Sequence, residues 1–177
     1  MVVKKIRATP TDELFRKYVK DLIDSAKEEI FVIAGEAGSY RSVDLRLAAA
    51  KARDRGIKIR MYAVNPPQEV VNGLLALGCE VYVGKEVPKD HCLVVDSNSW
   101  ILSKGHLPRK IGEREGEVHI NEPGSAKKVI DYFYRVVSKA ERKTKIEWDK
   151  DPLMVAIKNP PDWGIETDSS KLKEELF

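Results

Sequence analysis

Residues 43–84, VDLRLAAAKARDRGIKIRMYAVNPPQEVVNGLLALGCEVYVG, decide the fold. Their first thirteen residues put alanines and leucines on one helical face and basic side chains on the other, and Gly56 ends that helix. The run 57–64 then alternates like a strand, a proline pair opens another helix, and 79–84 forms a further strand. Helices that alternate with short apolar strands predict parallel strands covered by helices.

The preceding segment adds one more helix and one more strand. Thr9 can cap a helix, Pro10 suits its first position, and apolar side chains recur at helical spacing from Leu14 to Ala26. EEIFVIAG (28–35) follows and is typical of a buried strand. The α-β alternation therefore begins near the N-terminus.

The pattern changes after Gly84. Three short strands are predicted, at HCLVVD (91–96), WILS (100–103) and EVHIN (117–121). DSNS (96–99) predicts a compact turn between the first two.

A last helix is predicted to begin near Glu122 and to run through AERK (140–143). We therefore expect an α/β fold over residues 1–144, with a mixed, mostly parallel sheet flanked by helices. We expect residues 145–177 to form a C-terminal extension that packs on this body or on a partner.

Composition limits the function classes. At 177 residues with 42% hydrophobic side chains, one compact domain is expected. The 33% charged residues of both signs suit an ordinary surface as well as the ion-pair networks of a thermophile. A net charge of +3 supports no claim about nucleic acid by itself. There is no signal-peptide pattern and no apolar run of about 20 residues, so we expect a cytoplasmic protein without membrane contact.

The two cysteines, Cys79 and Cys92, each lie beside an apolar run and form no CxxC pair. This pattern predicts buried, reduced thiols rather than a disulfide framework. No zinc-ligand spacing is present, so we expect no metal and no cofactor.

The ordered segments resemble one half of a phospholipase D-type protein over about four-fifths of the chain. The resemblance lies in the helix before EEIFVIAG and in four further segments: AAAKARDRGIKIRMYAV, LLALGCEVYVG, HCLVVDSNSWILSK and EGEVHI. It implies a single half-domain, which in that family acts as a homodimer because two half-motifs must meet. The family signature is histidine, one residue, lysine, four residues and aspartate, followed by Gly-Ser-x-Asn.

Two residues apart on a strand, the histidine and the lysine of that signature reach the same phosphate. The histidine attacks phosphorus or protonates the leaving group, and the lysine neutralises phosphate oxygens. Aligned on Asp96, this sequence has Lys89 at the histidine position and His91 at the lysine position. Glu117 falls where the family often has a glutamate that orients the histidine.

The Gly-Ser-x-Asn position reads Ser103-Lys104-Gly105-His106. One interpretation, which we prefer, is that the motif is degenerate and the nucleophile is missing. The domain then keeps an anion-binding cleft lined by Lys89, His91, Lys104 and His106, with Ser103 nearby. In the other interpretation a two-residue deletion places His91 at the nucleophile position and Lys104 clamps the phosphate.

Other residues have structural interpretations. His119 lies in an alternating strand and is interpreted as structural. Asp96 is expected to fix the following turn through bonds to its backbone.

Three functions remain open. The first is a non-catalytic phospholipase D-like domain with a phosphate-binding cleft, used in binding or regulation. The second is a metal-independent phosphodiesterase or nuclease using His91, Lys104 and Glu117. The third is an interaction protein that docks a partner through its C-terminal tail. Expected partners are a second copy, nucleic acid or a phosphorylated small molecule, and a protein bound by the tail.

Overall fold

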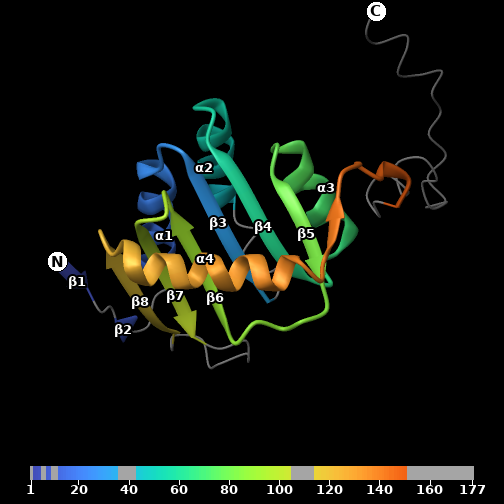
Figure 1. The fold of residues 1–177 in the computed structure, drawn as a ribbon. Helices are drawn as coiled ribbons and strands as arrows, with labels where there is room; N and C mark the ends of the chain where they lie inside the picture. The colour runs from blue at the N-terminus through green and yellow to red at the C-terminus, as the bar shows by residue number, and fades with distance from the viewer. Residues whose placement is uncertain (1, 5–6, 9–11, 36–42, 105–113, 151–177) are drawn as a thin grey trace, which may run out of the picture.

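The computed structural model describes residues 2–4, 7–8, 12–35, 43–104 and 114–150 (Figure 1). Its helices are α1 (Asp12–Ser25), α2 (Val43–Asp54), α3 (Gln68–Ala76), α4 (Pro123–Val137) and the 3-10 turn η2 (Trp148–Lys150). Its strands are β1 (Val2–Lys4), β2 (Arg7–Ala8), β3 (Glu29–Ala34), β4 (Lys58–Val64), β5 (Glu80–Gly84), β6 (Asp90–Val95), β7 (Ser99–Lys104), β8 (Arg114–Ile120) and β9 (Glu141–Lys143).

The strands form one mixed sheet in the order β1-β8-β7-β6-β3-β4-β5-β9, with β2 also paired to β8. The predicted α/β fold with a mixed sheet is confirmed. Only β3, β4 and β5 are parallel to one another, so the expectation of a mostly parallel sheet is wrong. The cause is connectivity: β6, β7 and β8 follow one another closely and pair antiparallel, and β6 also runs antiparallel to β3.

Each face of the sheet has its own core. Helix α4 crosses one face, and Figure 1 shows it in front of the strands with α1, α2 and α3 behind them. The α4 face buries a largely aromatic cluster that includes Phe31, Tyr62, Trp100 and Phe133. The opposite face buries an aliphatic cluster under α1, α2 and α3. Because strand side chains alternate between faces, cluster membership identifies the face to which each strand residue points.

Three short strands were not predicted. The charged run Glu141–Lys143 was expected to continue the last helix, but α4 ends at Val137 and these residues pair antiparallel with β5. β1 pairs with β8 through a register that matches Val3 with His119. The predicted cap Thr9 and Pro10 lie outside the described residues.

The predicted turn between β6 and β7 is confirmed. Asp96 and Ser97 have φ angles of 51° and 53°, and the backbone N–H of Asn98 donates to the carbonyl of Val95 at 3.1 Å. Positive φ at both central residues is the geometry that matches the twist of a hairpin. Asp, Asn and Ser near this turn therefore fit its backbone conformation.

Candidate functional site

The N-terminal end of β6 and the C-terminal ends of β3 and β7 meet at one edge of the sheet. His91, near the start of β6, pairs in register with Ser103 near the end of β7. Gly35 directly follows β3, which is the other neighbour of β6. The antiparallel pairing of β6 with both neighbours brings these three residues together.

The His91 imidazole is fixed by the backbone. The N–H of Gly35 donates a hydrogen bond to Nδ1 of His91 over 3.1 Å. His91 is half-buried and precedes Leu93 and Val95, which belong to the cluster under α1, α2 and α3. By strand alternation, His91 points to that same face. Sequence reasoning missed Gly35, although the glycine that ends EEIFVIAG was a signal for a close approach of backbone to another group.

The other predicted phosphate ligands differ in their burial and in whether the structure describes them. Ser103 is buried, with 6% of its surface exposed, and Lys89 is exposed just before β6. Lys104 ends β7 and pairs in register with Asp90, but its side chain lies outside the described residues. His106 lies wholly outside them. The structure therefore brings together His91 and Ser103 within the described part of the chain.

Glu117 lies on the other face of the sheet. Its neighbour Val118 belongs to the aliphatic cluster, so Glu117 and His119 point toward α4. Oε2 of Glu117 lies 3.2 Å from Nε2 of His119, not beside His91. The structure therefore does not bring Glu117 and His91 together, although the sequence had led us to expect that it would.

The ring of His119 stacks on Trp100, and its two nitrogens lie beside two carboxylates. Its ring lies parallel to the indole of Trp100, with centroids 4.0 Å apart and planes 4° apart. Its Nδ1 is 2.7 Å from Oε2 of Glu122, and this hydrogen bond is the main reason that the pKa of Glu122 lies below its ordinary value. Ser125 links Glu122 to the indole N–H. These contacts favour the structural interpretation of His119.

Asp96 lies at the far end of β6 from His91. Its carboxylate accepts backbone N–H bonds from Lys27 at 2.9 Å, Glu28 at 2.8 Å and Glu29 at 3.0 Å. These amides run from the segment after α1 into the first residue of β3, so Asp96 ties the hairpin to the start of a different strand. We expected the Asp96 side chain to form hydrogen bonds with the backbone of the turn that follows it. This expectation is wrong, because the carboxylate accepts from Lys27, Glu28 and Glu29 instead.

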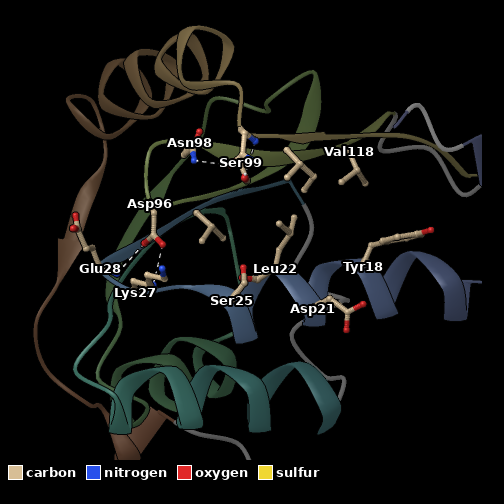
Figure 2. Close-up of a pocket in the computed structure, with 13 residues that line it drawn as sticks. Tyr18, Asp21, Leu22, Ser25, Lys27, Glu28, Asp96, Asn98, Ser99 and Val118 are labelled. Carbon is tan, nitrogen blue, oxygen red and sulfur yellow. Dashed lines mark hydrogen bonds between the residues drawn. The ribbon is translucent and has the colours of Figure 1, made fainter. Parts of the chain in front are cut away.

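A pocket of about 580 Å³ adjoins Asp96, between α1 and the strands β6, β7 and β8 (Figure 2). Several of its polar groups are already bonded within the protein: Ser25 donates to the carbonyl of Leu22, Asn98 donates to Asn121, and Ser99 accepts from the Asn121 amide. The charged residues Asp21, Lys27 and Glu28 also line this pocket, which lies at the opposite end of β6 from His91.

Both thiols are inaccessible. Burial raises the pKa of Cys79 to about 11 and that of Cys92 to about 12. Within the described ranges, no group of three His, Cys, Asp or Glu side chains is arranged to hold a metal ion. In the same part of the chain, every helix is too short or too polar to cross a bilayer.

Comparison with known proteins adds structural relatives. No family model and no curated protein matches the sequence. The structure is similar to Nuc, a phospholipase D family member from Salmonella typhimurium, with 18% identity, 73% of this chain and 91% of that chain covered, and a TM-score of 0.61. NucT from Helicobacter pylori matches at 13% identity over 74% of this chain and 92% of that chain, with a TM-score of 0.58.

TrmBL2, an archaeal chromatin protein whose structure shows a novel mode of DNA binding, matches at 18% identity with a TM-score of 0.62. The match covers 81% of this chain and 55% of TrmBL2. At these identities the likenesses concern the fold, and they confirm the predicted phospholipase D-like architecture.

Proposed function

We propose that this chain, which has the phospholipase D-like fold, is a non-catalytic domain that binds phosphate groups and acts in binding or regulation. The observation that carries the proposal is the hydrogen bond from the Gly35 N–H to Nδ1 of His91. In a neutral imidazole one nitrogen accepts and the other carries the proton. Because Nδ1 accepts here, the proton belongs on Nε2.

This tautomer does not suit a nucleophile. A histidine that attacks phosphorus needs a lone pair on the nitrogen facing the substrate, while the other nitrogen keeps its proton in a hydrogen bond. With Nδ1 already accepting from Gly35, Nε2 of His91 is a donor. A donor of this kind can bind a phosphate oxygen but cannot form the covalent bond.

The surroundings supply further groups for an anion. Ser103 has a hydroxyl beside His91 in the strand register, and Lys89 adds a positive charge just before β6. The proposal also includes Lys104 and His106, which follow directly along the chain from Ser103. The ligand is then a phosphate monoester or diester, from a nucleic acid or from a small molecule.

Two further parts of the proposal come from the family resemblance and the domain division. A single half-domain of this type pairs with a second copy, so we propose a homodimer, which sedimentation analysis tests directly. We also propose that residues 1–144 form the domain and that 145–177 are an extension. The fully buried Asn72 supports contact of the extension with the body, because its amide bonds both the N–H and the carbonyl of Glu147 at 3.0 Å.

A second candidate is a metal-independent phosphodiesterase using His91 with Lys104 and Glu117. It is favoured by the structural match to Nuc, which covers 91% of that chain. The position of Glu117 beside His119, on the other face from His91, counts against it.

One assay separates the two candidates. The full chain is incubated with DNA, RNA and a nitrophenyl phosphodiester in the presence of EDTA, and binding of pyrophosphate is measured by calorimetry. We expect no cleavage, pyrophosphate binding by the wild type, and weaker binding by His91→Ala. Cleavage that disappears in His91→Ala would establish the enzyme and overturn the proposal.

A further inference from the structure

The connection between β5 and β6 runs along the edge of the sheet at which His91 lies. β5 and β6 are not neighbours, because β4 and β3 lie between them, so the chain passes the ends of two strands before it enters β6. Figure 1 shows the connection passing below those ends. Residues 85–89, here called the crossover segment, make this connection.

The crossover segment has little slack. Three intervals between neighbouring strands, at about 4.8 Å each, amount to about 14 Å. The chain covers them in six residue steps, from Gly84 to Asp90, which reach at most about 20 to 22 Å when fully extended. The segment must therefore be nearly extended over most of its length.

Exposure along the crossover segment alternates, as it does in an extended chain. Val87 is 62% exposed and Lys89 is exposed, whereas Pro88 between them is fully buried. Pro88 fixes its own φ angle and restricts Val87 to extended conformations. His91 lies two positions after Lys89, so the same alternation directs both side chains to one side of the chain.

Tyr62 of β4 holds the crossover segment. Its side chain is fully buried, and its hydroxyl donates to the backbone carbonyl of Glu86 over 2.8 Å. Burial, followed by the charge of Glu86, raises the pKa of Tyr62, so the hydroxyl keeps its proton and remains a donor at neutral pH. This bond ties a nearly extended connection to a central strand of the sheet.

The contact between Tyr62 and the crossover segment requires glycine at the end of β5. A Cβ on Gly84 would lie 2.6 Å from Cε2 of the Tyr62 ring, which is closer than side chains approach one another. Without a side chain at Gly84, the ring lies against the end of β5, where its hydroxyl meets Glu86.

A second contact to Glu86 is weaker. Nζ of Lys139 lies 3.4 Å from Oε2 of Glu86, but both side chains are exposed, and exposed ion pairs contribute little. The bond from Tyr62 is buried and reaches the backbone itself. Tyr62 is therefore the stronger restraint on the crossover segment.

We infer that Tyr62 is a positioning residue for the phosphate site, because it holds the crossover segment so that Lys89 stays on the side of His91. The inference rests on the proposed function, since it concerns the affinity of that site. Tyr62 acts through Lys89 rather than by touching the ligand. A lysine whose backbone is already fixed loses less conformational entropy when it binds a phosphate.

The first test is calorimetric titration of the full chain with pyrophosphate. The variants are Tyr62→Phe, Lys89→Ala, the two combined, and the matched control Tyr82→Phe, whose hydroxyl bonds Oε2 of Glu80 instead of the crossover segment. We expect Tyr62→Phe to weaken binding about 3- to 10-fold, the effect of having to order one more side chain. In the Lys89→Ala background it should cause no further loss, and Tyr82→Phe should bind like the wild type.

A second measurement needs no ligand. Order parameters from ¹⁵N relaxation should be about 0.85 for the Val87 and Lys89 amides of the wild type and should fall toward about 0.6 in Tyr62→Phe. The amides of β4 should keep their values, which verifies that the variant is folded and that the change is local. Pro88→Ala, which leaves Tyr62 in place but removes the buried ring, should give the same loss of order and of affinity.

Three results overturn the inference: wild-type affinity in both Tyr62→Phe and Pro88→Ala, the same fold-loss for Tyr62→Phe with and without Lys89, or unchanged order parameters in the crossover segment. If His91→Ala still weakens pyrophosphate binding in that case, the proposed function stands and only the role of Tyr62 fails. A wild type that does not bind pyrophosphate overturns both.

Discussion

The carboxylate of Asp96 accepts the backbone N–H of Glu28 at 2.8 Å, although the two residues are 68 positions apart. The adjacent amides of Lys27 and Glu29 donate to the same carboxylate. The C-terminal end of α1 and the residue that follows it are bound by Arg55, whose guanidinium donates to the carbonyls of Ile23 at 2.9 Å and Ala26 at 3.5 Å. Asp96 thus helps to set where β3 begins, and β3 carries Gly35 to His91.

Replacing Asp96 should destabilise the fold. Asp96→Ala leaves three N–H groups without their acceptor and puts alanine at φ 51°, so we expect a loss of about 2 to 3 kcal/mol in the free energy of unfolding. Asp96→Asn keeps one acceptor oxygen and tolerates the backbone angle, so about 1 kcal/mol is expected. Urea unfolding measures both. Equal losses for the two variants would contradict the three-bond account.

Asn72 should control the attachment of the segment around Glu147. Asn72→Ala removes both bonds to the Glu147 backbone, so we expect rapid hydrogen exchange of the Glu147 amide and a loss of about 2 to 3 kcal/mol of stability. The control is Gln68→Ala, which removes only the bond from Gln68 to Asn72. If the Glu147 amide is still protected from hydrogen exchange in Asn72→Ala, other contacts hold the segment.

Glu122 should contribute to stability on the acid side. Its folded-state pKa is lowered, chiefly by the hydrogen bond with His119, so its contribution is present above its ordinary pKa of about 4.5 and is lost as pH falls through the folded value. Glu122→Gln should therefore lose less stability than the wild type between pH 6 and about pH 3. Thermal unfolding across that range measures the difference. Asp131→Asn is the control, because Asp131 is in an exposed pair with Lys127. If the stability of Glu122→Gln falls with pH as steeply as that of the wild type, Glu122 does not make this contribution.

The thiols of Cys79 and Cys92 should be inert in the folded protein. Burial keeps both protonated at neutral pH, with pKa values of about 11 and about 12, and the thiolate is the reactive form. We expect no reaction with a disulfide reagent at pH 8 until the chain unfolds. Raising the pH above the ordinary thiol pKa should also destabilise the fold, since only the unfolded state then ionises. Rapid labelling under native conditions would be inconsistent with the burial of either residue.

Local periodicity predicted most of the fold. The alternation in 57–64 and the helical spacing in 43–55 depend only on neighbours in sequence, and both elements form as expected. β9 was missed because Glu141–Lys143 has no apolar pattern and becomes a strand only by pairing with β5. That pairing is a tertiary event that no short window of sequence contains.

The sequence predicted which residues belong to the candidate site, but not which of them contact one another. Aligning the motif brought His91 and Ser103 into the prediction, and the strand register places them opposite each other. The alignment also suggested that Glu117 orients His91. The alternation of β8 instead turns Glu117 toward His119, and detecting this requires knowing which face α4 covers.

The central claim is that His91 is a hydrogen-bond donor and not a nucleophile, and its tautomer is the most direct test. The measurement is the ¹⁵N NMR spectrum of the histidine side chains at neutral pH, with His91 assigned by its loss in His91→Gln. The account predicts that Nδ1 of His91 is unprotonated and Nε2 carries the proton, as the bond from Gly35 requires. A proton on Nδ1, with the lone pair on Nε2, would contradict it.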